Sequence, residues 1–126
     1  MSQPIVFISR SRIKEGKLEG LKRYAPAITE LIKSNKPGTV AMLAYVDEDE
    51  AEAHIVHAFP DADAMARHLE GVGDRAAEAF DYIETTGYEI YGDPGEAVLE
   101  AMHGYATQFG VSLTVFPNMI GGYLGL

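Results

Sequence analysis

Two strand-like segments in direct succession constrain the fold more than any other feature of the sequence. Residues 39–47 (TVAMLAYVD) and 51–59 (AEAHIVHAF) are largely apolar and contain β-branched and aromatic side chains, and an acidic stretch at 47–50 joins them. Such a pair predicts an antiparallel hairpin with a solvated tip. A hairpin in mid-chain needs other elements to cover it, so the segments on either side decide the fold.

Strand and helix periodicities alternate around this hairpin. Residues 4–12 alternate as a strand, and residues 18–35 carry apolar side chains three and four positions apart, as on one face of a helix. After the hairpin, residues 62–83 have a helical pattern, interrupted at 71–73 (GVG), where paired glycines predict a bend or a break. Residues 86–92 predict a fourth strand.

Prolines mark two further points along the chain. Pro26 lies inside the first predicted helix, and because it has no N–H donor it predicts a kink or break near Tyr24. Residues 93–96 (DPGE) predict the start of a third helix, with the aspartate as its cap and the glutamate reaching back to the cap amide. That helix ends at Gly110, and residues 111–116 alternate as a fifth strand.

The predicted order is β-α-β-β-α-β with an added C-terminal α-β, which is an α+β fold of the ferredoxin-like type. A length of 126 residues with 47% hydrophobic residues suits one domain spanning 1–126. In this fold both helices cover one face of the sheet. Val6 and Ile8 on the first strand, and apolar residues on both faces of the second, indicate that the other face is also covered, so we expect a second copy of the chain to cover it as a homodimer.

The composition of the C-terminal segment also favours a dimer. Residues 104–126 contain no Asp, Glu, Lys, Arg or His, and we expect such a stretch to be mostly buried in a chain of net charge −9. Five glycines, with Pro117 and Asn118, interrupt it, so it does not predict a membrane span. Burial against a partner subunit is the preferred interpretation, and burial within its own subunit is the alternative.

Composition and charge exclude several classes of partner and site. The absence of cysteine excludes disulfides, thiolate nucleophiles and cysteine-bound zinc, and fits a cytoplasmic location. The net charge of −9 argues against nucleic acid and anionic membranes as partners. Residues 1–38 hold eight Lys or Arg and three Asp or Glu, whereas 39–126 hold two and sixteen, so the basic segment must lie against the acidic remainder.

Five short motifs give the sequence a family resemblance. They are residues 15–17 (EGK), 36–38 (KPG), 59–64 (FPDADA), 66–69 (ARHL) and 121–123 (GGY). Together they resemble the dimeric α/β-barrel superfamily and, within it, the antibiotic-biosynthesis-monooxygenase-like group. The resemblance implies dimerisation through the sheets and a ligand site between the sheet and the helices of one subunit. It also implies, for some members, oxidation of phenols or quinols by molecular oxygen without a cofactor; others degrade haem, and many have no known activity.

Three positions depart from the family pattern. Phe59 stands where monooxygenase and haem-degrading members usually have tryptophan, Ser9 where haem degraders have asparagine, and Glu78 where they have histidine. We therefore expect neither haem degradation nor a cofactor.

His57 is the main catalytic candidate. It shares a strand face with Phe59, which matches the family position that looks into the ligand pocket. An imidazole of near-neutral pKa could take the proton of a phenol or quinol. The alternative is a histidine hydrogen-bonded within a mixed core. His54 lies on the opposite face, so the two cannot chelate one metal, and no metal site is expected.

We predict one ligand site between the sheet and the second helix. His68, on that helix, is a second catalytic candidate. The resemblance favours a pocket role and a purely structural role equally for this residue. The predicted boundary consists of Ser9, Tyr45, His57, Phe59 and His68. Tyr45 could instead be a core tyrosine with a hydrated tip.

Two arginines on the first strand fall outside that site. Arg10 and Arg12 point to the other face, as ion-pair or rim residues of the dimer side.

Three functions from different classes remain open at this level, and the residues do not decide whether the chain is an enzyme. The first is a cofactor-independent oxygenase of a small phenolic or quinol substrate. The second is a non-catalytic small-molecule-binding or stress-related homodimer. The third is a structural or interaction domain, whose mark would be a pocket filled by its own side chains.

Overall fold

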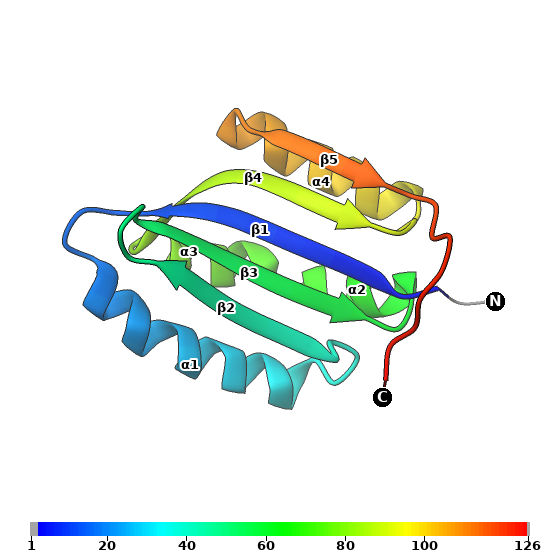
Figure 1. Ribbon diagram of the computed structural model, residues 1–126, viewed down its shortest axis with the longest axis horizontal. Coiled ribbons are helices and arrows are strands. Elements are labelled where there is room, and N and C mark those ends of the chain that lie inside the picture. Colours follow the sequence, from blue (N-terminus) through cyan, green and yellow to red (C-terminus); the bar gives the residue numbers. More distant parts are fainter. Residues whose placement is uncertain (1–2, 126) are drawn as a thin grey trace.

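The elements of the computed structural model, which describes residues 3–125, follow the predicted order (Figure 1). They are β1 (Ile5–Ile13), α1 (Leu18–Asn35), β2 (Ala41–Asp47), β3 (Glu52–Phe59), α2 (Ala62–Leu69), α3 (Val72–Ala79), β4 (Ile83–Tyr91), α4 (Glu96–Phe109) and β5 (Ser112–Phe116). The prediction of an α+β, ferredoxin-like chain with an added α-β is therefore confirmed.

One mixed sheet holds all five strands in the order β2-β3-β1-β4-β5. β1 is antiparallel to both β3 and β4, and β2 is antiparallel to β3, as the tight hairpin requires. β5 is parallel to β4 because the chain crosses over through α4 before it returns to the sheet. Helices α2, α3 and α4 lie behind the sheet and α1 runs along its β2 edge, so the other face of the sheet is open (Figure 1).

Two clusters of buried side chains form the core on the helical face. The larger lies beneath α2 and α4 and includes Phe7, Phe59, Met65 and Ile90. The smaller lies at the far end of the sheet and consists of Ile13, Leu21, Ala53 and Ile83. The region between the two clusters is where the cavity described below is found.

Three details differ from the sequence prediction. The first helix is not broken: α1 continues through Pro26, because Leu21 and Ile32 on either side are both buried and packing offsets the lost hydrogen bond. Ile83 begins β4 and does not end a helix, since its side chain belongs to the smaller core cluster. The third change concerns the start of α4.

The N-cap of α4 is Gly95, and not the aspartate that the sequence suggested. The Asp93 carboxylate accepts a hydrogen bond from the Gly95 amide at 2.9 Å, which closes a turn before the helix begins. By contrast, the break between α2 and α3 is confirmed. It falls at Gly71, whose φ of 73° is left-handed and suits glycine.

Ion pairs join the basic N-terminal segment to the acidic remainder, as the charge distribution predicted. They are Arg10–Glu89 at 3.5 Å, Arg12–Glu84 at 2.9 Å, Lys22–Glu48 at 3.4 Å and Lys36–Glu70 at 3.9 Å. The guanidinium of Arg12, through its hydrogen bond, lowers the pKa of the Glu84 carboxyl. Arg10 and Arg12 are thus ion-pair residues on the open face of the sheet.

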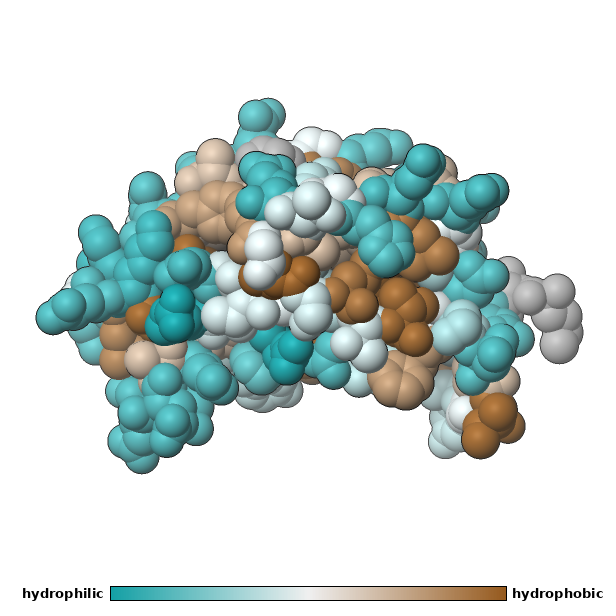
Figure 2. Space-filling view, turned by 90° about the horizontal axis from the view of Figure 1, so that it is seen from above, coloured by the Kyte–Doolittle hydropathy of each residue, from teal (hydrophilic) through white to brown (hydrophobic). Residues whose placement is uncertain are grey.

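The open face and the C-terminal tail expose large apolar side chains. Tyr45 on β2 is 59% exposed and Phe116 on β5 is 57% exposed, while Ile120 and Tyr123 in the tail are almost fully exposed. Apolar side chains gather between polar margins on the side that carries β5 and α4 (Figure 2). The end of the uncharged stretch is therefore not buried within its own subunit, whereas Ala106 is buried and Leu113 and Val115 pack against the core. None of the helices in residues 3–125 has the length and apolar character needed to traverse a bilayer.

Candidate functional site

A cavity of about 240 Å³ lies between the sheet and the helices. Its floor is formed by inward-facing residues of β1, β2, β3 and β4, and its walls come from all four helices. A cavity of roughly 150 Å³ lined by apolar side chains can hold benzene, so this one is large enough for an aromatic ring with substituents. This cavity is not filled by the chain's own side chains, as a pocket in a purely structural domain would be.

His57 forms part of the cavity wall and is held in a defined orientation. Its ring stacks on Phe7 at a centroid distance of 4.9 Å, and its Nδ1 lies 3.0 Å from the Phe7 carbonyl oxygen. A carbonyl only accepts hydrogen bonds, so Nδ1 carries the proton and Nε2 keeps a lone pair. No described residue bonds to Nε2, and it is not among the atoms that are fully enclosed without a partner. This nitrogen is therefore available to a ligand.

His68 reaches the same cavity from α2. Its Nδ1 lies 2.8 Å from the Thr39 hydroxyl oxygen, and its ring meets the edge of His57 at a centroid distance of 4.9 Å. Both imidazoles are buried, and burial is the main reason that the pKa of His57 falls to about 4 and that of His68 to about 3. The other ring and the charge of Arg75 lower the pKa of His68 further. At neutral pH both rings are uncharged, which corrects the near-neutral pKa expected for His57.

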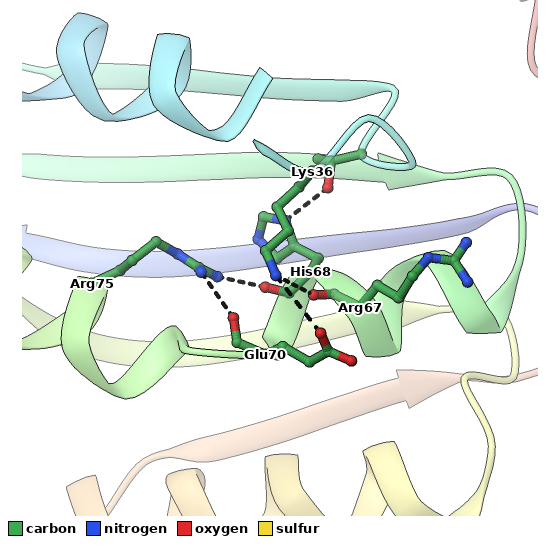
Figure 3. A network of polar contacts seen from close by, with 6 residues as sticks. Lys36, Arg67, His68, Glu70 and Arg75 are labelled. Atoms are coloured by element: carbon green, nitrogen blue, oxygen red, sulfur yellow. Dashed lines mark hydrogen bonds and ion pairs between the residues drawn. The ribbon is translucent and has the colours of Figure 1, made fainter. Parts of the chain in front are cut away.

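Two cations secure the end of α2 next to these rings (Figure 3). Lys36 donates to the Arg67 carbonyl at 2.8 Å, and Arg75 donates to the carbonyls of Glu70, at 3.0 Å, and His68. Carbonyls at the C-terminal end of a helix lack partners within the helix, and positive charge is favourable there. The network therefore fixes the backbone that carries the His68 side chain.

Arg75 also lines the cavity, although sequence reasoning did not select it. It lies on α3, and its backbone carbonyl accepts a 3.4 Å hydrogen bond from the Tyr24 hydroxyl of α1. One signal in the sequence could have drawn attention to it: residues 39–126 hold only two basic residues among sixteen acidic ones, and Arg75 is one of them.

The structure brings together three of the five predicted site residues. Ser9, His57 and His68 line one cavity. Phe59 does not: it is fully buried in the core and packs against His68 at a centroid distance of 5.2 Å. Phe59 thus supports the cavity wall from behind.

Tyr45 lies on the wrong side of the sheet for the predicted site. In the register of β2 and β3, Met42 pairs with His57 while Tyr45 pairs with His54. Because side chains alternate between faces, Met42 points into the cavity and Tyr45 points to the open face. No cluster of three or more His, Asp or Glu side chains suited to a metal ion occurs within residues 3–125.

Comparison with known proteins shows similarity at the level of structure. No protein-family model matches the sequence, and no curated protein matches it significantly. Among solved structures, MupZ from Pseudomonas fluorescens is similar with a TM-score of 0.71 and 20% identity, over 97% of this chain and 91% of MupZ. SnoaB from Streptomyces nogalater, a cofactor-independent oxygenase crystallised as a mutant, is similar with a TM-score of 0.58 and 16% identity, over 75% of this chain and 97% of SnoaB.

A third similar structure is a candidate antibiotic biosynthesis monooxygenase from Bacteroides thetaiotaomicron, with a TM-score of 0.56 and 19% identity over 70% of this chain and 85% of that one. The resemblance that short turn motifs indicated is thus confirmed for the fold. The match to MupZ leaves only about four residues unaligned, so it includes α4 and β5. The match to SnoaB leaves about a quarter of this chain without a counterpart.

Proposed function

We propose, starting from the fold shared with the cofactor-independent oxygenase SnoaB, that this chain oxidises a small phenolic or quinol compound with molecular oxygen and without a bound cofactor. The observation that carries the proposal is the oriented imidazole of His57, whose free Nε2 lies beside a cavity that fits one aromatic ring. Fold similarity alone would not support an activity, because one fold hosts many functions.

The chemistry needs a proton acceptor and an oriented ring more than it needs a metal. Once the hydroxyl proton leaves, the electron-rich ring anion can pass an electron to oxygen, and the two radicals combine at a ring carbon. Loss of water from the resulting hydroperoxide gives a quinone. For a phenol the balance is one phenol and one O2 to one quinone and one water, with the substrate as the source of all four electrons. In this proposal His57 accepts the hydroxyl proton on Nε2, and its contact with the Phe7 carbonyl supports the assignment.

The low pKa of His57 restricts which hydroxyl it can deprotonate. An ordinary phenol has a pKa of about 10. Transfer of its proton to an imidazole of pKa about 4 would cost roughly 8 kcal/mol, from six pKa steps of about 1.4 kcal/mol each. The substrate hydroxyl must therefore be made more acidic within the cavity, or the substrate must be acidic by itself.

A non-catalytic small-molecule-binding dimer is the second candidate, because the same cavity would serve it. Oxygen consumption separates the two. We expect the purified chain to consume oxygen with at least one member of a panel of naphthols, hydroquinones and polyphenols, with quinone absorbance rising in step. No uptake above the uncatalysed rate across the panel, together with ligand binding in the cavity, would favour the binding protein.

The open face of the sheet supports a homodimer as the working form. Its strands carry exposed apolar side chains such as Leu43 and Tyr45, and the tail adds Ile120 and Tyr123. Exposed apolar groups gathered on one face are costly in water and mark an interaction surface. A second copy is the partner we propose because the sheet presents the same pattern to itself about a two-fold axis. Residues 104–126 would contribute to the contact.

Replacing Tyr45 with glutamate is expected to convert the dimer to a monomer, because the change places an unpaired charge among the apolar side chains of the proposed interface. Light scattering at micromolar concentration measures the mass. Leu31, on α1, is 50% exposed and gives a matched control, since Leu31→Glu should leave the dimer intact. A monomeric mass for the unmodified chain, or equal dissociation by both variants, would contradict the proposed interface.

A further inference from the structure

We propose that the cavity binds its ligand as an anion, an aromatic compound whose ionised oxygen group, a carboxylate or an ionised hydroxyl, is held by the guanidinium of Arg75. The inference deepens the proposed function by naming the substrate class, and rests on that function only in treating the ligand as a substrate. Binding itself needs no turnover and is tested separately.

Arg75 is placed to make this contact. It lies on α3, lines the cavity and is half-buried. A guanidinium has five N–H donors, and two of them here serve the carbonyls of His68 and Glu70. Three N–H groups remain for a ligand, in the planar arrangement that matches a carboxylate.

The charge of Arg75 has no counter-ion within the described part of the chain. Arg10, Arg12, Lys22 and Lys36 each lie within 4 Å of a carboxylate, whereas no Asp or Glu oxygen of residues 3–125 does so for Arg75. Exposed cations such as Lys33 and Arg67 also lack a carboxylate of the described residues within 4 Å, but water solvates them, whereas Arg75 is half-buried. Burial disfavours the charged form and is the main cause of the lowered Arg75 pKa. An anionic ligand would supply the missing negative charge.

The remaining walls fit the rest of such a ligand. Phe7, Tyr88 and Met102 contribute apolar and aromatic surface on one side, and Phe80 and Phe109 pack edge to face on another. The two histidines are uncharged, so they neither attract nor repel an anion strongly. Arg75 is therefore the group that selects charge, and the walls select the ring.

This arrangement also resolves the mismatch of pKa between His57 and a phenol. A positive charge beside the ligand lowers the pKa of its hydroxyl, and the anion that forms raises the pKa of the nearby imidazole. The two pKa values move toward each other on binding. Proton transfer from the ligand hydroxyl to His57, which is very unfavourable at the pKa values that the two groups have apart, thereby becomes accessible.

A purely structural role for Arg75, as the cap of α2, makes a different prediction from the anion site. The test is isothermal titration of the full chain at pH 7.5 with 2-naphthoate and with 2-naphthamide, which has the same shape and no charge. We expect 2-naphthoate to bind about 10- to 100-fold more tightly, the range for a hydrogen bond to a charged group. Arg75→Gln should remove that preference, because it should weaken 2-naphthoate binding far more than 2-naphthamide binding.

Two variants and one spectroscopic readout complete the experiment. Arg67→Gln removes an exposed cation from the neighbouring α2 and should keep the preference, which controls for overall charge. Arg75→Lys should retain part of it, because the charge remains without the planar donors. In NMR titrations of histidine ring protons, 2-naphthoate should raise the pKa of His57, and 2-naphthamide should not.

Equal affinity of the unmodified chain for the two probes would overturn the inference. So would a pair of results in which Arg75→Gln binds neither probe and Arg75→Lys binds both with equal affinity. Failure here differs from failure of the oxygenase proposal. 2-Naphthoate has no hydroxyl to oxidise, so charge-selective binding without oxygen uptake on phenols would support the anion site and reject the oxygenase. Oxygen uptake with phenols, without a preference for 2-naphthoate over 2-naphthamide, would support the oxygenase and reject the anion site.

Discussion

The His57→Gln variant is expected to turn over an oxidisable phenol or quinol at least about 100-fold more slowly than the unmodified chain, the usual contribution of a general base. Glutamine can fill much of the same space and can still donate to the Phe7 carbonyl. It cannot offer a lone pair on nitrogen where Nε2 now lies. The loss should therefore appear mainly in kcat, with the substrate still bound at the guanidinium of Arg75.

Initial rates of oxygen consumption over a range of substrate concentrations measure this effect. His103→Gln is the matched control, because His103 is an exposed histidine on α4 that does not line the cavity. It should behave as the unmodified chain. If His57→Gln keeps full turnover, His57 has only a structural role, and the proposed chemistry must be assigned to another group or abandoned.

Acidification from pH 7.5 to pH 5.0 is expected to lower the free energy of unfolding by about 2 kcal/mol through His57 alone. The pKa of this ring is about 4 in the folded chain, against 6.5 in the unfolded one, because burial penalises the charged form. Below pH 6.5 the unfolded chain takes up a proton that the folded chain does not. Stability is therefore complete above pH 6.5 and falls as the pH drops toward 4, with a full loss of about 3 kcal/mol.

His68 and Arg75 face the same cavity and act in the same direction, because His68 has a still lower pKa and the Arg75 charge opposes protonation of both rings. Urea unfolding at pH 7.5, 6.0 and 5.0 measures the slope. His57→Gln should make the slope shallower, with the contribution of His68 remaining, and His103→Gln should leave it unchanged. A slope that is identical in all three chains would mean that His57 is protonated as easily in the folded chain as in the unfolded one.

The order of elements was predictable because each element has its own periodicity in the sequence. Alternating residues in β1 and β3, and the three-to-four spacing in α1, depend only on neighbours along the chain. That Ser9, His57 and His68 line one cavity was predictable from the parity of residues along the two strands and from the position of the helix that follows the second one. These inferences needed no knowledge of distant contacts.

The errors came from relations that periodicity does not contain. The face on which Tyr45 lies depends on the register between β2 and β3, which the length of the acidic hairpin tip sets, and a shift of one residue would reverse it. Arg75 entered the site because α3 folds back over the gap between two core clusters. That is a tertiary relation, and no pattern within residues 72–79 reveals it.

The left-handed turn at Gly71 separates α3, which carries the proposed ligand-recognition residue Arg75, from the preceding part of the chain, which carries the proposed proton acceptor His57. His57 belongs to the sheet, where its strand pairs with β1 and β2, whereas Arg75 belongs to an eight-residue helix that follows this glycine. Changes in the length or direction of α3 would resize the cavity and alter its charge without disturbing a single strand pair. The fold is therefore suited to divergence, because substrate preference can drift through α3 while the sheet and its oriented imidazole are inherited intact.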